Sequence, residues 1–257
     1  MSSIIAGLSG SLLAGLSTFI GALPILLFRK IDERWISIML GFGGGVMLAA
    51  SAFSLILPGT EAAIALGYGK LWAAMVMAIG VAVGGWLLSL IHRFFPHEHF
   101  IKGKEGSTPA SLARIWLLIA AITLHNFPEG LAVGVSFGDD NLSNGWITAL
   151  GIGLQNIPEG LVVAVSLIAE KYSVRYALWA SLLTGLVEPI GGIIGLSVVN
   201  LTTLILPWAM AFAAGAMLFV ICDEIIPEAY QRGKEREGTI GVMVGFIIMM
   251  VLDISLG

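Results

Sequence analysis

The sequence predicts an all-α polytopic membrane protein with eight transmembrane helices. Hydrophobic residues make up 57% of its 257 residues and charged residues only 12%, and the mean hydropathy is +0.94. The apolar residues form long continuous runs, whereas the strands of a membrane β-barrel alternate between apolar and polar positions. Because a spanning helix needs about 20 mostly apolar residues, these runs are long enough to cross a bilayer. We therefore expect a single transmembrane domain over residues 1–257.

Eight runs have the length and composition of a spanning helix. In chain order, they cover residues 4–28, 35–57, 71–92, 113–137, 145–169, 176–199, 204–226 and 239–256. Glycine is dense in the second, third and sixth runs, where small residues let membrane helices approach closely. The fourth and fifth runs carry a repeated polar motif, the sixth carries Glu188 beside Pro189, and the seventh ends near Asp223 and Glu224.

Basic residues predict the orientation of these helices. Twelve of the 13 lysines and arginines lie in or beside the loops after the first, third, fifth and seventh helices, and only Lys70 lies on the other side. Short loops rich in positive charge stay in the cytoplasm, so these four loops are predicted to be cytoplasmic and both termini to be outside. The twelve residues are Arg29, Lys30, Arg34, Arg93, Lys102, Lys104, Arg114, Lys171, Arg175, Arg232, Lys234 and Arg236.

The longest connection, residues 93–112, is predicted to be a cytoplasmic loop that contains histidines. His97 and His99 lie in it, and His92 lies just before it. Imidazole is a common ligand for transition metals, so the loop is a candidate for weak metal binding. A solvated polar linker is the alternative interpretation. Asp223 and Glu224 are a similar case, since they are either ligands on the path of an ion or interfacial charges.

The first two helices are partly repeated in the sixth and seventh at an offset of 170 residues. The matching pairs are Leu12 and Leu182, Gly15 and Gly185, Ile20 and Ile190, Gly21 and Gly191, Gly45 and Gly215, Met47 and Met217, and Leu48 and Leu218. The second helix runs outward and the seventh inward, so we expect helices 1–3 and 6–8 to form an inverted repeat around helices 4 and 5. Transporters built in this way bind their substrate near the membrane midplane. Chance alignment of glycine-rich apolar helices is the alternative.

The repeated polar motif places ionisable groups inside the membrane. It reads HNFPEGL over residues 125–131 and QNIPEGL over residues 155–161. Residues four apart share one face of a helix, so His125 pairs with Glu129, and Gln155 pairs with Glu159. A carboxylate at bilayer depth costs at least about 2–3 kcal/mol on insertion scales, and such residues are usually functional. A core histidine bonded to a backbone carbonyl is the alternative for His125.

The groups around these motifs favour a transition-metal ion. Three glutamates at one depth, with Glu188 as the third, would repel one another unless they were protonated or bridged by a cation. Imidazole, carboxylates, amide oxygens and the thioether of Met47 suit Zn²⁺, with Fe²⁺, Mn²⁺, Co²⁺ and Cd²⁺ as competitors. An all-oxygen shell would instead favour Ca²⁺ or Mg²⁺. Simple packing is the alternative role for Met47.

The HNxPEG and QNxPEG pair, Glu188-Pro189 and the eight-helix outline resemble the ZIP (Zrt-, Irt-like) family of metal transporters, and most of all its bacterial GufA-type branch. The resemblance implies uptake of divalent metal into the cytoplasm across the inner membrane, without an organic cofactor or nucleic acid, by a protein that is commonly a homodimer. It also implies that helices 1, 4, 5 and 6 slide as a unit against helices 2, 3, 7 and 8. It further implies two neighbouring metal positions, one formed by Met47, His125, Glu129, Gln155 and Glu159, and a second formed by Asn126, Glu129, Asn156, Glu159 and Glu188.

Asn156 departs from the pattern of that branch, in which the residue after the glutamine is often aspartate. An amide removes one negative charge from the second metal position that the resemblance implies. We therefore expect this position to be weak or accessory. Whether one or two ions bind stays open.

Three other classes of protein are weaker interpretations. An intramembrane zinc hydrolase usually has two or three imidazole or cysteine ligands and an open water position, whereas this chain has one intramembrane histidine and no HExxH motif. A passive cation channel uses rings of charges or carbonyls from several subunits, which an inverted repeat does not favour. A metal sensor would need a sizeable soluble output domain. We therefore expect a transporter that is not an enzyme.

Overall fold

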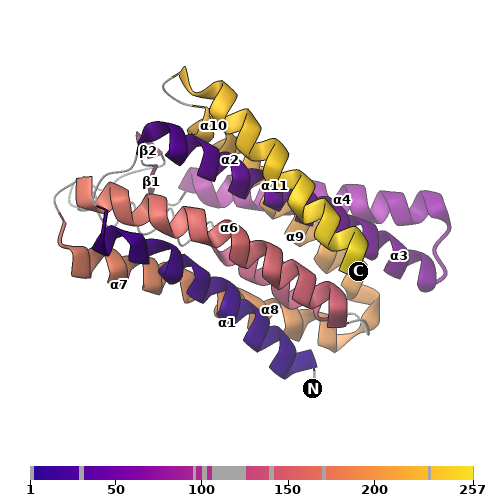
Figure 1. Cartoon of the computed structure of the whole chain (residues 1–257). Coiled ribbons are helices and arrows are strands. Elements are labelled where there is room, and N and C mark those ends of the chain that lie inside the picture. The colour runs from indigo at the N-terminus through magenta and orange to yellow at the C-terminus, as the bar shows by residue number, and fades with distance from the viewer. Residues whose placement is uncertain are drawn as a thin grey trace.

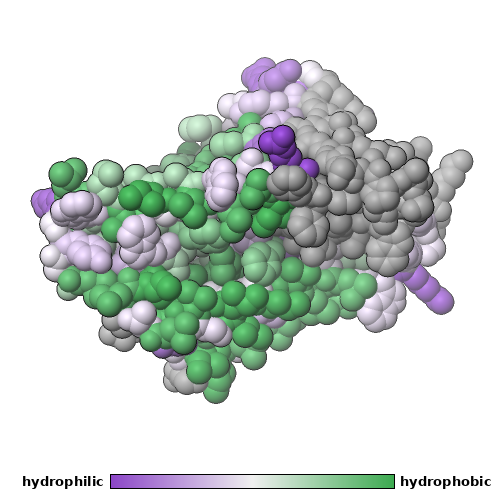
Figure 2. All heavy atoms as spheres, turned by 180° about the vertical axis from the view of Figure 1, so that it is seen from behind, coloured by the Kyte–Doolittle hydropathy of each residue, from purple (hydrophilic) through white to green (hydrophobic). Residues whose placement is uncertain are grey.

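The computed structural model describes residues 3–28, 32–94, 97–99, 103–105, 126–138, 142–169, 172–230 and 233–256. This part of the chain folds into long helices that run alongside one another (Figure 1). Seven helical segments are long and apolar enough to cross a membrane, namely Ser3–Leu26, Glu33–Ala65, Lys70–Ile91, Leu142–Val165, Val174–Leu201, Leu206–Ala229 and Glu235–Leu256. Apolar side chains also cover much of the visible surface in Figure 2. The protein is therefore a multi-pass membrane protein.

These seven segments correspond to seven of the eight predicted helices. The remaining prediction, residues 113–137, falls partly outside the described residues, but its described part is helical over residues 126–136. The count of eight spans therefore stays a prediction.

Three of the seven candidate spans, Glu33–Ala65, Val174–Leu201 and Leu206–Ala229, are interrupted by a break or a π-helical turn. The helices are α1 (Ser3–Ala22), α2 (Glu33–Ala49), α3 (Leu57–Ala65), α4 (Lys70–Phe94), α6 (Leu142–Ala169), α7 (Val174–Gly185), α8 (Val187–Leu201), α9 (Leu206–Val220), α10 (Ile226–Ala229) and α11 (Glu235–Leu256). Turns of 3₁₀-helix cover Leu23–Leu26 and Thr203–Ile205, and π-helical turns cover Ala50–Ile56 and Ile221–Ile225. The segment over residues 126–136 is called helix 126–136 below.

Each π-helical turn ends just before a proline. The N–H of Leu57 bonds to the carbonyl five residues back, at Ala52, and Pro58 follows. Proline has no N–H to donate, so the carbonyl one turn earlier, at Ser54, lacks its helical partner. The side chain of Asn144, on α6, donates a hydrogen bond to this carbonyl at 3.2 Å. The proline thus creates an acceptor that ties α6 to the end of the π-helical turn.

The loop between α4 and helix 126–136 is not wholly irregular. Its described residues form a short antiparallel hairpin of β1 (His97–His99) and β2 (Gly103–Glu105), in which His97 is paired with Glu105. The all-α prediction therefore applies to the membrane part of the chain. The side chains of His92, His97 and His99 lie outside the described residues, so their proposed role in metal binding stays a prediction.

Close contacts at glycines join α1, helix 126–136, α6, α7 and α8 into one group, which we call the α1 group. Gly15 and Gly185 lie against each other, so that a methyl group on either would collide with the carbonyl oxygen of the other. Gly160 packs in the same way on the backbone of Thr18. Gly134 packs on the backbone of Gly192. Only glycine allows backbones to approach so closely.

The same kind of contact joins α2 to α11, α11 to α10 and α4 to α9, and the chain runs directly from α2 into α3 and from α9 into α10, so these six helices form a second group, which we call the α2 group. Gly45 packs on the backbone of Val242, which joins α2 to α11, and Gly215 packs on the backbone of Val81, which joins α9 to α4. In Figure 1, α2, α4, α9 and α11 lie above α1, α7 and α8, with α6 between the two sets.

The two groups contact each other mainly through side chains. Gly43 on α2 faces the side chain of Gln155, and Gly151 on α6 faces the side chain of Met249. Among the described residues, every glycine whose added methyl group would lie within 3.4 Å of the backbone of another helix has that contact inside its own group, whereas a methyl group on Gly43 would lie 3.8 Å from the Gln155 carbonyl oxygen across the groups. The seam between the groups is therefore the place where the fold lacks direct glycine-to-backbone packing.

Candidate metal centre

The polar residues of the predicted site lie on four elements that meet inside the bundle. Asn126 and Glu129 lie on helix 126–136, and Gln155, Asn156 and Glu159 lie on α6. Two further candidates lie on α8 and α2, Glu188 and Met47 respectively. The prolines explain part of this geometry, because Pro158 interrupts the hydrogen bonding of α6 in the middle of the motif.

Glu188 occupies a special position because its helix is broken beside it. α7 ends at Gly185 and α8 begins at Val187, which places Glu188 in the first turn of α8. Pro189 is tolerated there because the N–H groups of a first turn have no helical partner. The backbone of Glu188 is held by Gly130, which packs directly on it. The contact between helix 126–136 and the start of α8 therefore fixes the position of Glu188 relative to Glu129.

All seven of these side chains are buried. Met47, Asn126, Asn156 and Glu188 have no exposed surface, and Glu129, Gln155 and Glu159 are 1%, 2% and 8% exposed, respectively. A set of three carboxylates and three amides in the core of a membrane protein carries a large desolvation cost unless it is well paired. It therefore marks a functional site rather than ordinary packing.

The glutamates on different helices interact with one another. Glu129 lies within electrostatic reach of Glu159 and Glu188, and the side chain of Gln155 donates a hydrogen bond to Glu129. The amide nitrogen of Gln155 also donates to Oε2 of Glu159. Gln155 thus supplies N–H donors to two carboxylates on different helices.

Asn156 is bonded on the other side of the site. Its Nδ2 donates to Oε1 of Glu188 at 2.6 Å and to the backbone carbonyl of Ala14 on α1 at 2.8 Å. An amide nitrogen has two hydrogens, so both of its donors are used. Asn156 therefore links α6, α8 and α1 through its nitrogen, while its Oδ1 has no hydrogen-bond partner among the described residues.

Five buried oxygen atoms of this site have no hydrogen-bond partner among the described residues. A buried polar atom left unpaired costs about 1–3 kcal/mol, and a divalent cation satisfies several such oxygens at once. The five atoms are Oδ1 of Asn126, Oε2 of Glu129, Oε1 of Gln155, Oδ1 of Asn156 and Oε2 of Glu188. Their chemistry fits a cation, because every one of them is an acceptor.

Two predicted ligands need separate mention. His125 lies outside the described residues, so its position stays a prediction. Met47 lies one turn after Gly43, which faces Gln155, so the two positions share a face of α2. In the described part of the chain, no three histidine, cysteine, aspartate or glutamate side chains are close enough to hold an ion by themselves. A complete ligand shell therefore needs the amides, His125 or Met47.

The structure also shows a polar cluster that the sequence did not single out. The hydroxyl of Ser54 donates to Oδ1 of Asp253 at 2.7 Å, while the Ser54 carbonyl accepts from Asn144. Nearby, the hydroxyl of Ser143 donates to the carbonyl of Leu256 at 2.9 Å. These bonds connect the start of α6 with the α2 group. Pro58 was the available signal, because it leaves the Ser54 carbonyl without a helical partner.

The accessory acids lie apart from this cluster. Asp223 and Glu224 are in the π-helical turn after α9, and Glu224 is 1% exposed. A small cavity lies between α2, α6 and this turn, and it is lined by Gly43 on α2, by Gln155 and Glu159 on α6, and by Ile225 in the turn. The turn therefore lies next to the metal centre, and the predicted role of the two acids on the path of the ion stays a prediction.

The fold and the site together are those of a multi-pass membrane protein with a cluster of buried carboxylates and amides inside its helical bundle. A family model described as "ZIP Zinc transporter" matches residues 95–253. The chain is 46% identical to the zinc transporter GufA of Myxococcus xanthus, over 98% of this chain and 99% of the relative. It is 44% identical to the zinc transporter ZIPB of Bordetella bronchiseptica, over 94% and 78%, and 33% identical to human zinc transporter ZIP11, over 100% and 98%. The chain belongs to the ZIP zinc transporter family, and the predicted likeness to its GufA-type members is confirmed.

Proposed function

We propose that this protein carries Zn²⁺, and related ions such as Fe²⁺, Mn²⁺, Co²⁺ and Cd²⁺, across the bacterial inner membrane into the cytoplasm. The observation that carries the proposal is the set of buried, unpaired oxygens on helix 126–136, α6 and α8. We propose Zn²⁺ as the main substrate because the relatives GufA and ZIPB are described as zinc transporters. Membership of a transporter family also favours transport over intramembrane hydrolysis.

The proposed ligands are the residues of the two motifs together with Glu188 and Met47. One position would use Met47, His125, Glu129, Gln155 and Glu159. A second position would share the two motif glutamates and add Asn126, Asn156 and Glu188. The hydrogen bonds of Asn156 support a weak or absent second ion, because its amide nitrogen already donates a hydrogen bond to one oxygen of Glu188 and so stabilises that carboxylate without a cation.

We further propose that the α1 group slides against the α2 group during transport, which is an elevator-like form of alternating access. The distribution of glycine contacts supports this division. Direct glycine-to-backbone packing holds each group together, whereas side chains fill the seam. The metal ligands of the α1 group would then move together, since Gly130 and Asn156 both tie Glu188 to its neighbours. Met47 would stay behind on α2.

An inverted repeat of helices 1–3 and 6–8 is part of this proposal, and it receives support from equivalent contacts. Gly45 packs on Val242 and Gly215 packs on Val81, where the glycines are 170 positions apart and the valines 161. The third and last described spans also share a local sequence, with IGVAVG over residues 79–84 and IGVMVG over residues 240–245. The two π-helical turns follow the same offset of about 170 residues. An inverted repeat also fits eight spans with both termini outside.

Metal uptake into sealed proteoliposomes loaded with a zinc-sensitive dye tests the proposal directly. We expect dye signal with the wild-type protein, a large loss with His125→Ala, and no competition from Mg²⁺. Mn²⁺ and Cd²⁺ should compete with Zn²⁺, because the mixed oxygen and nitrogen site suits them. Absence of zinc flux from folded protein would contradict transport. Flux that equals the maximal rate of an open pore, without saturation by Zn²⁺, would favour a passive channel.

The proposed homodimer and the role of the histidine loop need separate measurements. Light scattering of the purified protein gives the number of chains per particle. Replacing His97 and His99 by Ala removes the imidazoles of the loop itself, and adding His92→Ala extends the change only to the last turn of α4. A fall in zinc flux with unchanged folding would support a metal-binding role for that loop.

A further inference from the structure

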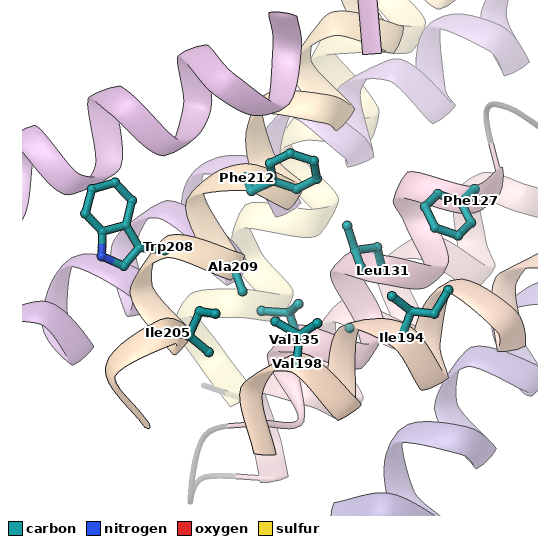
Figure 3. A pocket seen from close by; sticks show the side chains of 10 residues that line it. Phe127, Leu131, Val135, Ile194, Val198, Ile205, Trp208, Ala209 and Phe212 are labelled. Carbon is teal, nitrogen blue, oxygen red and sulfur yellow. The ribbon is translucent and has the colours of Figure 1, made fainter. Parts of the chain in front are cut away.

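A cavity of about 330 Å³ lies behind the metal centre, between helix 126–136, α8 and α9. Figure 3 shows the side chains of its lining, which converge from these three segments. The lining consists of Phe127, Leu131, Val135, Ile194, Gly195, Val198, Ile205, Trp208, Ala209 and Phe212. Apart from the indole N–H of Trp208, these side chains offer no hydrogen-bonding group.

The cavity opens onto the apolar outer surface of the bundle. Ile194 is 43% exposed and Trp208 is 37% exposed, and Ile190 and Ile193 extend the same exposed apolar surface along α8. Both α8 and α9 belong to segments with the length and composition of membrane spans. In a bilayer, the outer surface of such spans faces lipid hydrocarbon, so the cavity would open toward the acyl chains of the lipids.

The chemistry of the lining decides what fills the cavity. Water needs two to four polar partners, and the side chains of this lining offer only the indole N–H of Trp208. A lipid headgroup would need charged or polar side chains, which are also lacking. The volume lies at the lower end of the range of about 300–1,000 Å³ for pockets that hold small ligands. A single hydrocarbon chain matches both the volume and the apolar lining.

The cavity also touches the helix that carries the metal ligands. Phe127, Leu131 and Val135 follow one another at intervals of four, so they form one face of helix 126–136. Glu129 is two residues from both Phe127 and Leu131, which places it about 200° around the helix from each of them. An occupant of the cavity therefore presses on the back of the helix whose front faces the metal centre.

The two walls of the cavity belong to different groups of helices. Helix 126–136 and α8 are part of the α1 group, and α9 is part of the α2 group. We propose that one acyl chain of a membrane phospholipid binds in this cavity and acts as a wedge between the two groups. Sliding of the groups would pull the walls past each other, so the bound chain favours the arrangement seen in this structure.

Photolabelling of the wild-type protein tests the binding site without reference to metal transport. The protein is reconstituted with phosphatidylcholine that carries a diazirine in the middle of one acyl chain, and labelled residues are mapped by peptide mass spectrometry. We expect labels to concentrate on the lining of the cavity compared with Ile247 and Val251, which are exposed apolar residues of α11. Equal labelling of the cavity and of α11 would overturn the proposal.

A variant that fills the cavity provides the matched comparison. Ala209→Trp places a large side chain in the space, whereas Ile247→Trp places the same side chain on the lipid-exposed face of α11. We expect Ala209→Trp to reduce labelling of the cavity about tenfold, equivalent to a loss of about 1.4 kcal/mol in binding, and Ile247→Trp to leave it unchanged. Unchanged labelling of a folded Ala209→Trp protein would contradict acyl-chain binding. Elution volume and melting temperature report folding, and the wild-type map remains decisive if that variant does not fold.

The effect on transport rests on the proposed function. The tryptophan of Ala209→Trp is a permanent wedge, so zinc influx should fall several-fold while zinc binding to the purified protein stays the same. Labelling of the cavity together with normal influx by Ala209→Trp would overturn the role as a wedge. Absence of influx by the wild type would instead contradict transport itself, and it would leave the photolabelling result intact.

Discussion

The side-chain nitrogen of Asn156 lies 2.6 Å from Oε1 of Glu188, across the contact between α6 and α8. The same nitrogen lies 2.8 Å from the carbonyl of Ala14 on α1. One uncharged side chain therefore joins three helices of the α1 group and compensates a buried carboxylate. An aspartate at this position could not do so, because it has no N–H to donate. Asn156 thus acts as a structural bridge at a position where the family resemblance implies a metal ligand.

The bridge predicts how Asn156→Asp should behave. The substitution removes the donor and places a second negative charge beside Glu188, so the metal-free protein should become less stable. A second cation would then be favoured between the two carboxylates. We expect zinc bound to the purified protein, measured by elemental analysis, to rise from roughly one ion per chain to two, as an additional carboxylate ligand permits. An unchanged ratio would show that Asn156 does not limit the number of ions.

Removing the central carboxylate should abolish transport without unfolding the protein. Glu129 interacts with two other glutamates of the site and is 1% exposed. Glu129→Gln keeps the shape but removes a negative charge that would bind the cation, so zinc flux into proteoliposomes should fall to the background. The melting temperature should stay equal or rise, because the buried repulsion is relieved. Wild-type flux in Glu129→Gln would contradict the assignment of the site.

The glycine contacts predict a strong position dependence of one simple substitution. Gly134 packs on the backbone of Gly192, whereas Gly69 has no atom within 4 Å of a potential side chain. Gly134→Leu should therefore force α8 away from helix 126–136, at a cost of at least about 1–3 kcal/mol. Gly69→Leu, which makes the same change in open space, should leave the melting temperature almost unchanged. Similar melting temperatures for the two variants would argue against tight packing in the α1 group.

Cross-linking across the seam tests the proposed sliding motion. Ser143 and Leu256 are in hydrogen-bond contact between α6 and α11, so cysteines at these positions should be joined by a short bis-methanethiosulfonate reagent, which links each thiol through a disulfide bond that a reducing agent can cleave. The exposed Cys222 is first replaced by serine. We expect the cross-link to stop zinc flux and a reducing agent to restore it, because the bond fixes the two groups together.

A control pair for this experiment lies within the α2 group. The side chains of Tyr230 and Thr239 are 3.3 Å apart between α10 and α11. A cross-link between cysteines at these positions should leave transport unaffected. Full activity of the cross-linked 143–256 pair would exclude sliding at this seam.

The sequence predicted the spans well but predicted their internal breaks poorly. Seven predicted helices are confirmed as candidate spans, because long apolar runs report membrane helices directly. The break at Leu186 and the two π-helical turns were missed, because they leave hydropathy almost unchanged. Hydrogen-bond pattern rather than hydropathy distinguishes a π-helical turn from an α-helix. Pro58 was the only local signal for the first of these turns.

The candidate site was predicted from residue type and spacing, and the structure adds the direction of each bond. Asn126, Glu129, Gln155 and Glu159 could be grouped in advance, because the motif repeats on two neighbouring helices. The donor role of Asn156 could not be predicted, since it depends on the approach of α1 and α8 to α6. A sequence shows which side chains have atoms that could bind a metal ion. Only tertiary contacts show which of these groups already make hydrogen bonds within the protein.

The contrast between glycine packing within each group and side-chain packing at the seam has a consequence for the evolution of this fold. A substitution at Gly15 or Gly185 meets a fixed backbone, so almost any change there is lost to selection against misfolding. A substitution at the seam meets only side chains, which adjust by changing rotamers. Mutations can therefore accumulate at the seam and alter the speed of transport or its adaptation to another membrane, while the two halves of the protein keep their shape.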